Sequence, residues 1–105
     1  MAKIISSQRF LSKSIVKEKR LKKDYDVYIT PKFNVDGVDY AAIIDGHHSY
    51  AAAMEDNARP NMITATVQDD DRVGLINNGK IDEFLMAAQH DCPWYDIKTG
   101  ADEWD

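Results

Sequence analysis

The feature that most constrains the fold is an apolar stretch that ends in Asp-Gly and runs straight into an alanine-rich stretch. Residues 38–44 read Val-Asp-Tyr-Ala-Ala-Ile-Ile, which is typical of a strand. Glycine allows the sharp turn that follows, and the alanines of residues 50–55 favour a helix. Asp45 is a residue type that caps helices with its carboxylate. The sequence therefore predicts a strand that turns at Gly46 into a helix capped by Asp45.

The start of this helix predicts a binding site for an anion. The first N–H groups of a helix have no partner inside it, and the helix dipole favours negative charge there. His47 and His48 lie at this position and can donate to phosphate, exchange protons near neutral pH, or bind a metal. Local hydrogen bonding by two helix-terminal histidines is the simpler alternative. The chemistry indicates a phosphate or carboxylate pocket with titratable donors.

The remaining elements follow from hydrophobic periodicity and turn residues. We expect a short strand at 3–5, a helix within 8–23, a strand over 26–35 interrupted at Pro31, a hairpin turn at Asp36-Gly37, a strand over 62–67, loop at 72–80, and an amphipathic helix from Ile81 to Ala88 that Pro93 terminates. This order predicts an α+β (mixed α/β) fold, with one small sheet and helices packed against it.

The length of 105 residues argues for a single domain. We divide it into a basic N-terminal segment (1–25), the motif core (26–68), and a C-terminal helix with an acidic aromatic tail (69–105). Trp94 and Trp104 in that tail are either core residues or a partner-binding patch, and the core reading is favoured.

Charge is distributed unevenly along the chain. Residues 1–23 carry eight basic side chains and one acid, whereas the other 82 residues carry five basic side chains and seventeen acids. A basic segment of this kind can bind nucleic acid through phosphates. The candidate contacts are Lys17, Lys19, Arg20, Lys22 and Lys23. The alternatives are a solvated helix face or a folding partner for the acidic body, which would itself repel a DNA duplex.

Cysteine content and hydropathy predict the cellular compartment. The single cysteine, Cys92, excludes an internal disulfide and agrees with a reducing compartment. No apolar run approaches the ~18 residues of a membrane span, and Ile4-Ile5 are too few for a signal-peptide core. We expect a cytoplasmic protein that does not contact a membrane.

The segment Ile44-Asp45-Gly46-His47-His48-Ser49-Tyr50-Ala51-Ala52-Ala53, placed after a strand–hairpin–strand, resembles the ParB/sulfiredoxin superfamily over about residues 26 to 68. The resemblance is to its ParB-like N-terminal or nuclease domains, and to a single-domain member. It implies a nucleoside triphosphate, ATP or CTP, bound with Mg²⁺ and phosphates surrounded by Gly46, His47, His48 and Ser49, with Asp45 beside them. It further implies weak NTPase, nuclease or phosphotransfer activity, a hydrolase in which His47 and His48 are the catalytic candidates.

Departures from the family pattern limit what the resemblance implies. Sulfiredoxins have their catalytic cysteine directly after this glycine, where this chain has His47, so we do not expect a sulfinic-acid reductase. Ser49 occupies a position where many relatives have arginine, and 37 residues follow Gln68. We therefore do not expect a complete chromosome-segregation clamp.

Two other classes of function stay open. One is an accessory protein of the phage or plasmid type that binds a protein partner, as an inhibitor or a nucleic-acid mimic, without catalysis. The other is DNA binding through the basic N-terminal segment, with an affinity that falls steeply with salt.

A metal ion is a further alternative at two places. His47, His48, His90 and Cys92 are ligand types for zinc, although no established zinc spacing is present. The run Asp69-Asp70-Asp71 could hold magnesium, although such a run is usually a solvated turn.

Overall fold

The fold is built on a mixed sheet, seen in a computed structural model that describes residues 2–104. Within these residues the strands are β1 (Lys3–Ser6), β2 (Asp26–Ile29), β3 (Phe33–Val35), β4 (Val38–Asp45), β5 (Asn61–Thr64) and β6 (Tyr95–Asp96). The helices are α1 (Lys13–Lys22), α2 (His47–Glu55), α3 (Val73–Asn77) and α4 (Ile81–Ala87). The predicted α+β class is confirmed.

The long strand β4 lies in the middle of the sheet and organises it. The strand order is β5-β2-β4-β1-β6, and β3 pairs with β4 as a hairpin. β4 runs parallel to β1 and antiparallel to β2 and β3. The predicted hairpin turn is confirmed, because Asp36 and Gly37 both have positive φ, at 50° and 86°, as the favoured two-residue turn requires.

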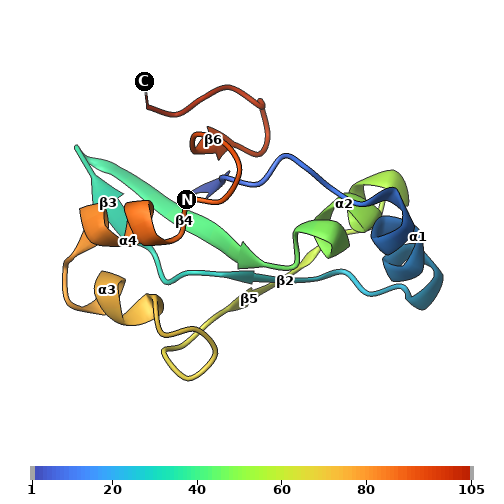
Figure 1. Cartoon of the computed structure of the whole chain (residues 1–105), viewed down its shortest axis with the longest axis horizontal. Coiled ribbons are helices and arrows are strands. Elements are labelled where there is room, and N and C mark those ends of the chain that lie inside the picture. The colour runs from blue at the N-terminus through green and yellow to red at the C-terminus, as the bar shows by residue number, and fades with distance from the viewer. Residues whose placement is uncertain (1, 105) are drawn as a thin grey trace.

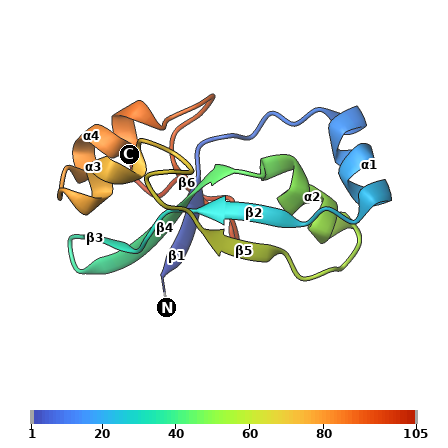
Figure 2. The same cartoon turned by 90° about the horizontal axis from the view of Figure 1, so that it is seen from below.

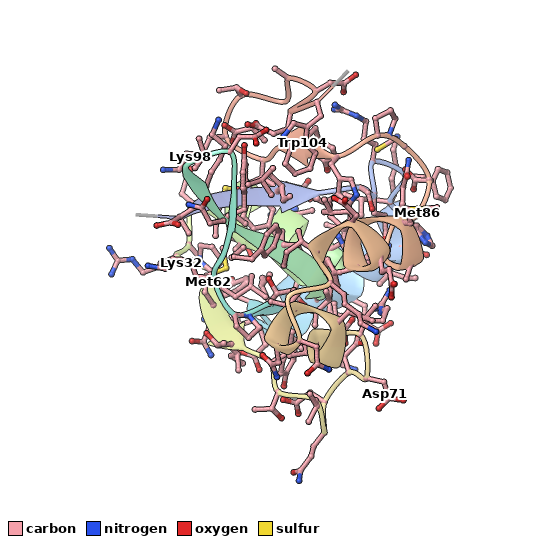
Figure 3. The ribbon with its side chains drawn as sticks, turned by 90° about the vertical axis from the view of Figure 1, so that its left-hand side faces the viewer. Lys32, Met62, Asp71, Met86, Lys98 and Trp104 are labelled. Carbon is pink, nitrogen blue, oxygen red and sulfur yellow. The ribbon has the colours of Figure 1, made fainter. Side chains whose placement is uncertain are left out.

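The hydrophobic core lies between one face of the sheet and the chain that follows β5. Phe84 of α4 is fully buried, with its ring centroid 6.0 Å from that of Phe33 and 6.2 Å from that of Trp94. Trp104 packs edge-on against Tyr40 at 5.1 Å. Both tail tryptophans therefore contribute to packing, as the favoured reading predicted. Met86, on the opposite side of α4, points into solvent (Figure 3).

The four helices gather at the two ends of the sheet. α1 and α2 pack together at one end, and α3 and α4 lie at the other (Figures 1 and 2). The packing of α1 and α2 buries Val16, Ala52 and Ala53. The turn between β4 and α2 therefore lies against α1, a helix that precedes it by more than twenty residues.

The helix predicted within 8–23 is α1, which begins at Lys13, since Ser12 caps it and the Asp91 carboxylate accepts the N–H groups of Arg9 and Phe10 in an extended segment. Two other predictions were wrong. β5 ends at Thr64, short of the predicted residue 67. Residues 73–77 form α3 and not a loop, because Val73 and Ile76 are buried in the core.

Over residues 2–104, no helix combines the length and the apolar character needed to cross a membrane.

Candidate functional site

The turn between β4 and α2 accepts only glycine. Gly46 has a φ of 88°, a conformation that side chains rarely adopt. A Cβ at this position would overlap the carbonyl oxygen of Asp26 and would lie 2.9 Å from the Cα of Val27. β2 therefore passes so close to the turn that the chain needs both the conformational freedom of glycine and its lack of a side chain.

The predicted cap of α2 was wrong in one respect. The N-cap residue is Gly46, and no side chain caps the helix. The Asp45 carboxylate accepts the N–H of Gly46 at 2.8 Å, because the helix begins one residue later than a cap at Asp45 requires. The first donor bonded within the helix is the N–H of Tyr50, which donates to the Gly46 carbonyl at 2.8 Å. The N–H groups of residues 47–49 therefore precede the hydrogen-bonded part of the helix.

The start of α2 opens onto a hollow of about 380 Å³. Its lining residues come from the end of β4, the start of α2, helix α1 and the segment before α1: Gln8, Ile15, Lys19, Ile44, Asp45, Gly46, His47, His48 and Ser49. The structure thus brings together all five residues predicted to surround phosphates, Asp45 to Ser49. It adds α1 as a second wall.

Lys19 supplies a positive charge to this hollow. Its Nζ donates to Asp24 Oδ2 at 3.0 Å, and the Ser49 hydroxyl donates to the other oxygen of Asp24 at 3.3 Å. The hydrogen bond with Asp24 raises the pKa of Lys19, and the same bond lowers the pKa of Asp24, so both groups are charged at neutral pH. From the sequence, Lys19 was predicted to bind nucleic acid; its position in this hollow was missed because it depends on how α1 packs against α2.

His48 connects the two helices. Its Nε2 accepts the backbone N–H of Ser12 at 3.1 Å, and Ser12 is the N-cap residue of α1. An Nε2 that accepts a hydrogen bond carries no proton, so this contact is made by the neutral ring with its proton on Nδ1. His48 therefore holds α1 in place as one wall of the hollow.

His47 faces a more enclosed environment. Its Nε2 is buried and has no hydrogen-bond partner within residues 2–104. The pKa of His47 is lowered to about 4, chiefly by burial and to a smaller extent by the nearby His90 and His48, against the opposing effect of Asp45 and Asp91. His47 lines the hollow and also a cavity of about 70 Å³ on its other side. A neutral ring with this pKa is a weak proton acceptor at pH 7.

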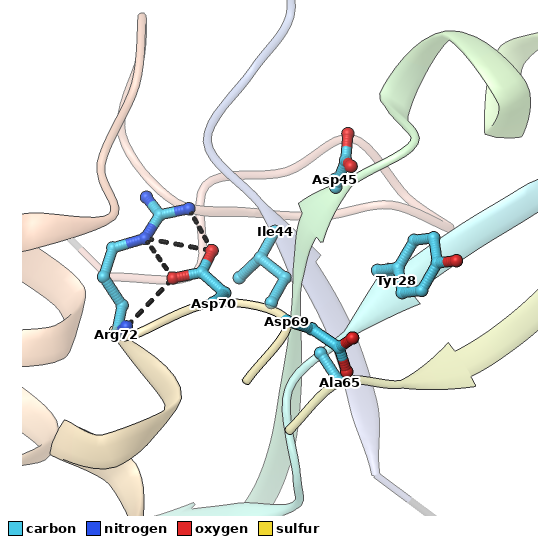
Figure 4. A pocket seen from close by; sticks show the side chains of 7 residues that line it. All are labelled: Tyr28, Ile44, Asp45, Ala65, Asp69, Asp70 and Arg72. Atoms are coloured by element: carbon cyan, nitrogen blue, oxygen red, sulfur yellow. Dashed lines mark hydrogen bonds and ion pairs between the residues drawn. The ribbon is translucent and has the colours of Figure 1, made fainter. Parts of the chain in front are cut away.

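A second hollow, of about 420 Å³, lies at the end of β4 (Figure 4). The two hollows share Ile44 and Asp45. The ring of Tyr28 forms one wall of the second hollow, and the opposite wall is an ion pair in which Arg72 donates to both oxygens of Asp70, at 2.6 and 3.0 Å. Arg72 is held in place by this pair and lowers the pKa of Asp70.

Neither metal alternative is assembled by the described residues. No group of three or more His, Cys, Asp or Glu side chains within residues 2–104 is arranged to hold an ion. In the acidic run, Asp70 is paired with Arg72, and the Asp69 carboxylate accepts the N–H of Thr66 at 2.8 Å. These two carboxylates therefore stabilise the loop before α3.

Most of the predicted nucleic-acid contacts are paired with acids of the same chain. Lys19 binds Asp24; the other pairs are Arg20 with Asp56 at 2.7 Å and Lys22 with Glu18 at 2.9 Å. In the part of the chain that the structure describes, Lys17 and Lys23 form no ion pair. Part of the basic segment is therefore neutralised on folding.

Comparisons with protein-family models, with curated proteins and with solved structures gave no match. The similarity to the ParB/sulfiredoxin superfamily stays a prediction from the sequence.

Proposed function

We propose that this protein binds a nucleotide, with the phosphates at the start of α2. One observation carries the proposal: a turn that only glycine can adopt opens the uncapped end of α2 onto a hollow that also contains Lys19. Uncapped N–H groups together with the helix dipole attract anions, and the ammonium group of Lys19, although paired with Asp24, adds a charged donor for phosphate oxygens. Lys19 and Ser49 line the same hollow, so the lysine would supply the cation that this chain does not have at position 49.

The adjoining hollow is the natural place for the nucleoside part of the ligand. Each hollow falls within the range of roughly 300 to 1,000 Å³ that is usual for small-molecule sites, at about 380 and 420 Å³. Tyr28 offers an aromatic face, and the carboxylates of Asp69 and Asp70 can accept hydrogen bonds from amino or hydroxyl groups.

Magnesium fits this site only together with the phosphates. Asp45 is exposed and stands between the two hollows, where its charge repels an anion. Mg²⁺ is commonly held by one or two carboxylates and completed by phosphate oxygens and water. Asp45 would be its protein ligand, and the ion would neutralise charge on the phosphates.

The reaction, if the ligand is turned over, is the weak NTPase, nuclease or phosphotransfer activity expected from the sequence. His47 is neutral at pH 7 and suits hydrogen bonding to the ligand better than proton abstraction. His48 would have to release the Ser12 N–H before its Nε2 could take a proton. We also propose a cytoplasmic location, with which the single cysteine agrees.

The test is a calorimetric titration with ATP, CTP, GTP and their diphosphates, with and without magnesium. We expect one base to bind best, and Lys19→Gln to weaken binding at least about tenfold through loss of the charge on phosphate. Lys22→Gln is the matched control, because Lys22 lies on the same helix and does not line the hollow. Absence of binding at millimolar concentrations, or equal loss in both variants, would refute the proposal. Gly46 variants are unsuitable here, because they disturb the fold.

A further inference from the structure

A further concave surface lies between α1 and α2, on a different face of α1 from Lys19. It is a groove of about 670 Å³. The residues of α1 that line it recur at positions 13, 16, 17 and 20, the spacing of a single helix face. α2 contributes Ala51 and Glu55, which are one turn apart. The groove is thus framed by two helices and is separate from the hollow at the start of α2.

The rim of the groove is cationic. Arg9, Lys13, Lys17 and Arg20 line it, against the single acid Glu55. Arg9 donates to the Gly100 carbonyl at 2.7 Å, is paired with Asp102 and stacks on an aromatic ring. Arg20 is paired with Glu55, at the end of α2, and with Asp56. Within the described residues, Lys13 and Lys17 form no ion pair. Two full positive charges, one helical turn apart, therefore face the groove without a partner.

The floor of the groove is apolar. It is formed by Leu11, Val16 and Ala51. Two large apolar side chains are next to lining residues in sequence. They are Phe10, before Leu11, and Leu21, after Arg20, and both are 77% exposed. An apolar floor with exposed apolar residues next to it in sequence is compatible with a protein-binding surface.

We propose that this groove binds an acidic amphipathic peptide segment of a partner protein. The carboxylates of the segment would pair with Lys13 and Lys17, and its apolar side chains would cover the floor, which is the helix-in-groove mode of recognition. A nucleic-acid strand would use the cations and leave the apolar floor without a complement.

The experiment selects ligands from a random peptide library displayed on phage, with the complete protein as the target. Enriched peptides are synthesised, and their affinities are measured by fluorescence anisotropy against the wild type and the Lys13→Glu/Lys17→Glu variant. We expect the enriched peptides to combine Asp or Glu with Leu or aromatic residues, to bind at least about tenfold more weakly to the variant, and to bind more weakly as salt rises.

The control is Lys80→Glu/Lys98→Glu, which makes the same charge change at two exposed lysines outside the groove and should leave the affinity unchanged. The proposal would be overturned if no peptide is enriched, if the enriched peptides carry no acids, or if both variants lose affinity equally. Binding of a labelled oligothymidine that is lost only in the groove variant would assign the surface to single-stranded nucleic acid and overturn it as well. Peptide binding should survive Lys19→Gln, so this proposal and the nucleotide proposal can fail separately.

Discussion

Replacing Gly46 by alanine should destabilise the protein far more than the same change at another glycine of similar φ. Two effects add at this position. The conformation at φ 88° costs a residue with a Cβ about 1 to 2 kcal/mol. The new Cβ also overlaps the backbone of Asp26 and Val27, and overpacking of this kind costs about 1 to 3 kcal/mol. We therefore expect a loss of about 3 kcal/mol.

The backbone cannot move away at low cost, because β2 is hydrogen-bonded on both sides, to β4 and to β5. Gly79→Ala is the matched control, since Gly79 has a φ of 73° with nothing within 4 Å of a Cβ, and only the conformational cost of about 1 kcal/mol remains. Urea unfolding of both variants, followed by fluorescence of the buried Trp94, measures the difference at constant m-value. If the free energies of unfolding of Gly46→Ala and Gly79→Ala differ by less than about 0.5 kcal/mol, the reasoning is refuted.

Three further predictions concern the core, pH and a buried acceptor. Phe84→Ala should cost about 3 to 5 kcal/mol in urea unfolding, whereas Met86→Ala, at a position 79% exposed on the same helix, should change little. The pKa of His47 in the folded state is lowered from 6.5 to about 4, so its contribution to stability is complete above pH 6.5 and is lost as pH falls toward 4. The unfolding midpoint should therefore fall from pH 7 to pH 4.5, and His47→Gln should remove this fall. The Tyr40 hydroxyl donates to the Glu103 carboxylate at 2.8 Å, and Glu103→Ala removes this acceptor, which should cost about 1 to 3 kcal/mol of unfolding free energy. Glu103→Gln keeps an oxygen that can accept the bond and should cost less.

The parts of the fold that the sequence predicted well are those in which local residues determine the structure. The Asp36-Gly37 turn needs positive φ at both positions, and both residue types tolerate it. The helix at 81–87 has its apolar residues three and four apart, facing the core. α3 was missed for a physical reason: five residues are too few to show a helical period, and Gly74 lies within them. Its stability comes from burial of Val73 and Ile76, which is a tertiary effect.

At the candidate site, the residue types were predictable and most of their contacts were not. The Asp-Gly-His-His segment was found because strand, turn and helix signals are adjacent in sequence. The hydrogen-bond partner of His48 is Ser12, 36 residues earlier. Lys19, which lines the same hollow, belongs to α1 and precedes the hairpin in the chain. Neither contact leaves a local pattern, because it depends on the packing of α1 against α2.

Gly46 illustrates how these two levels combine. Its place between a predicted strand and a predicted helix indicated a turn residue, and a glycine tolerates the positive φ that the turn has. Its second constraint, the absence of space for a Cβ, comes from β2, whose Asp26 lies twenty residues earlier in the chain. β2 also contacts α2. The strand that makes the glycine necessary therefore packs against the helix whose start forms the proposed phosphate site.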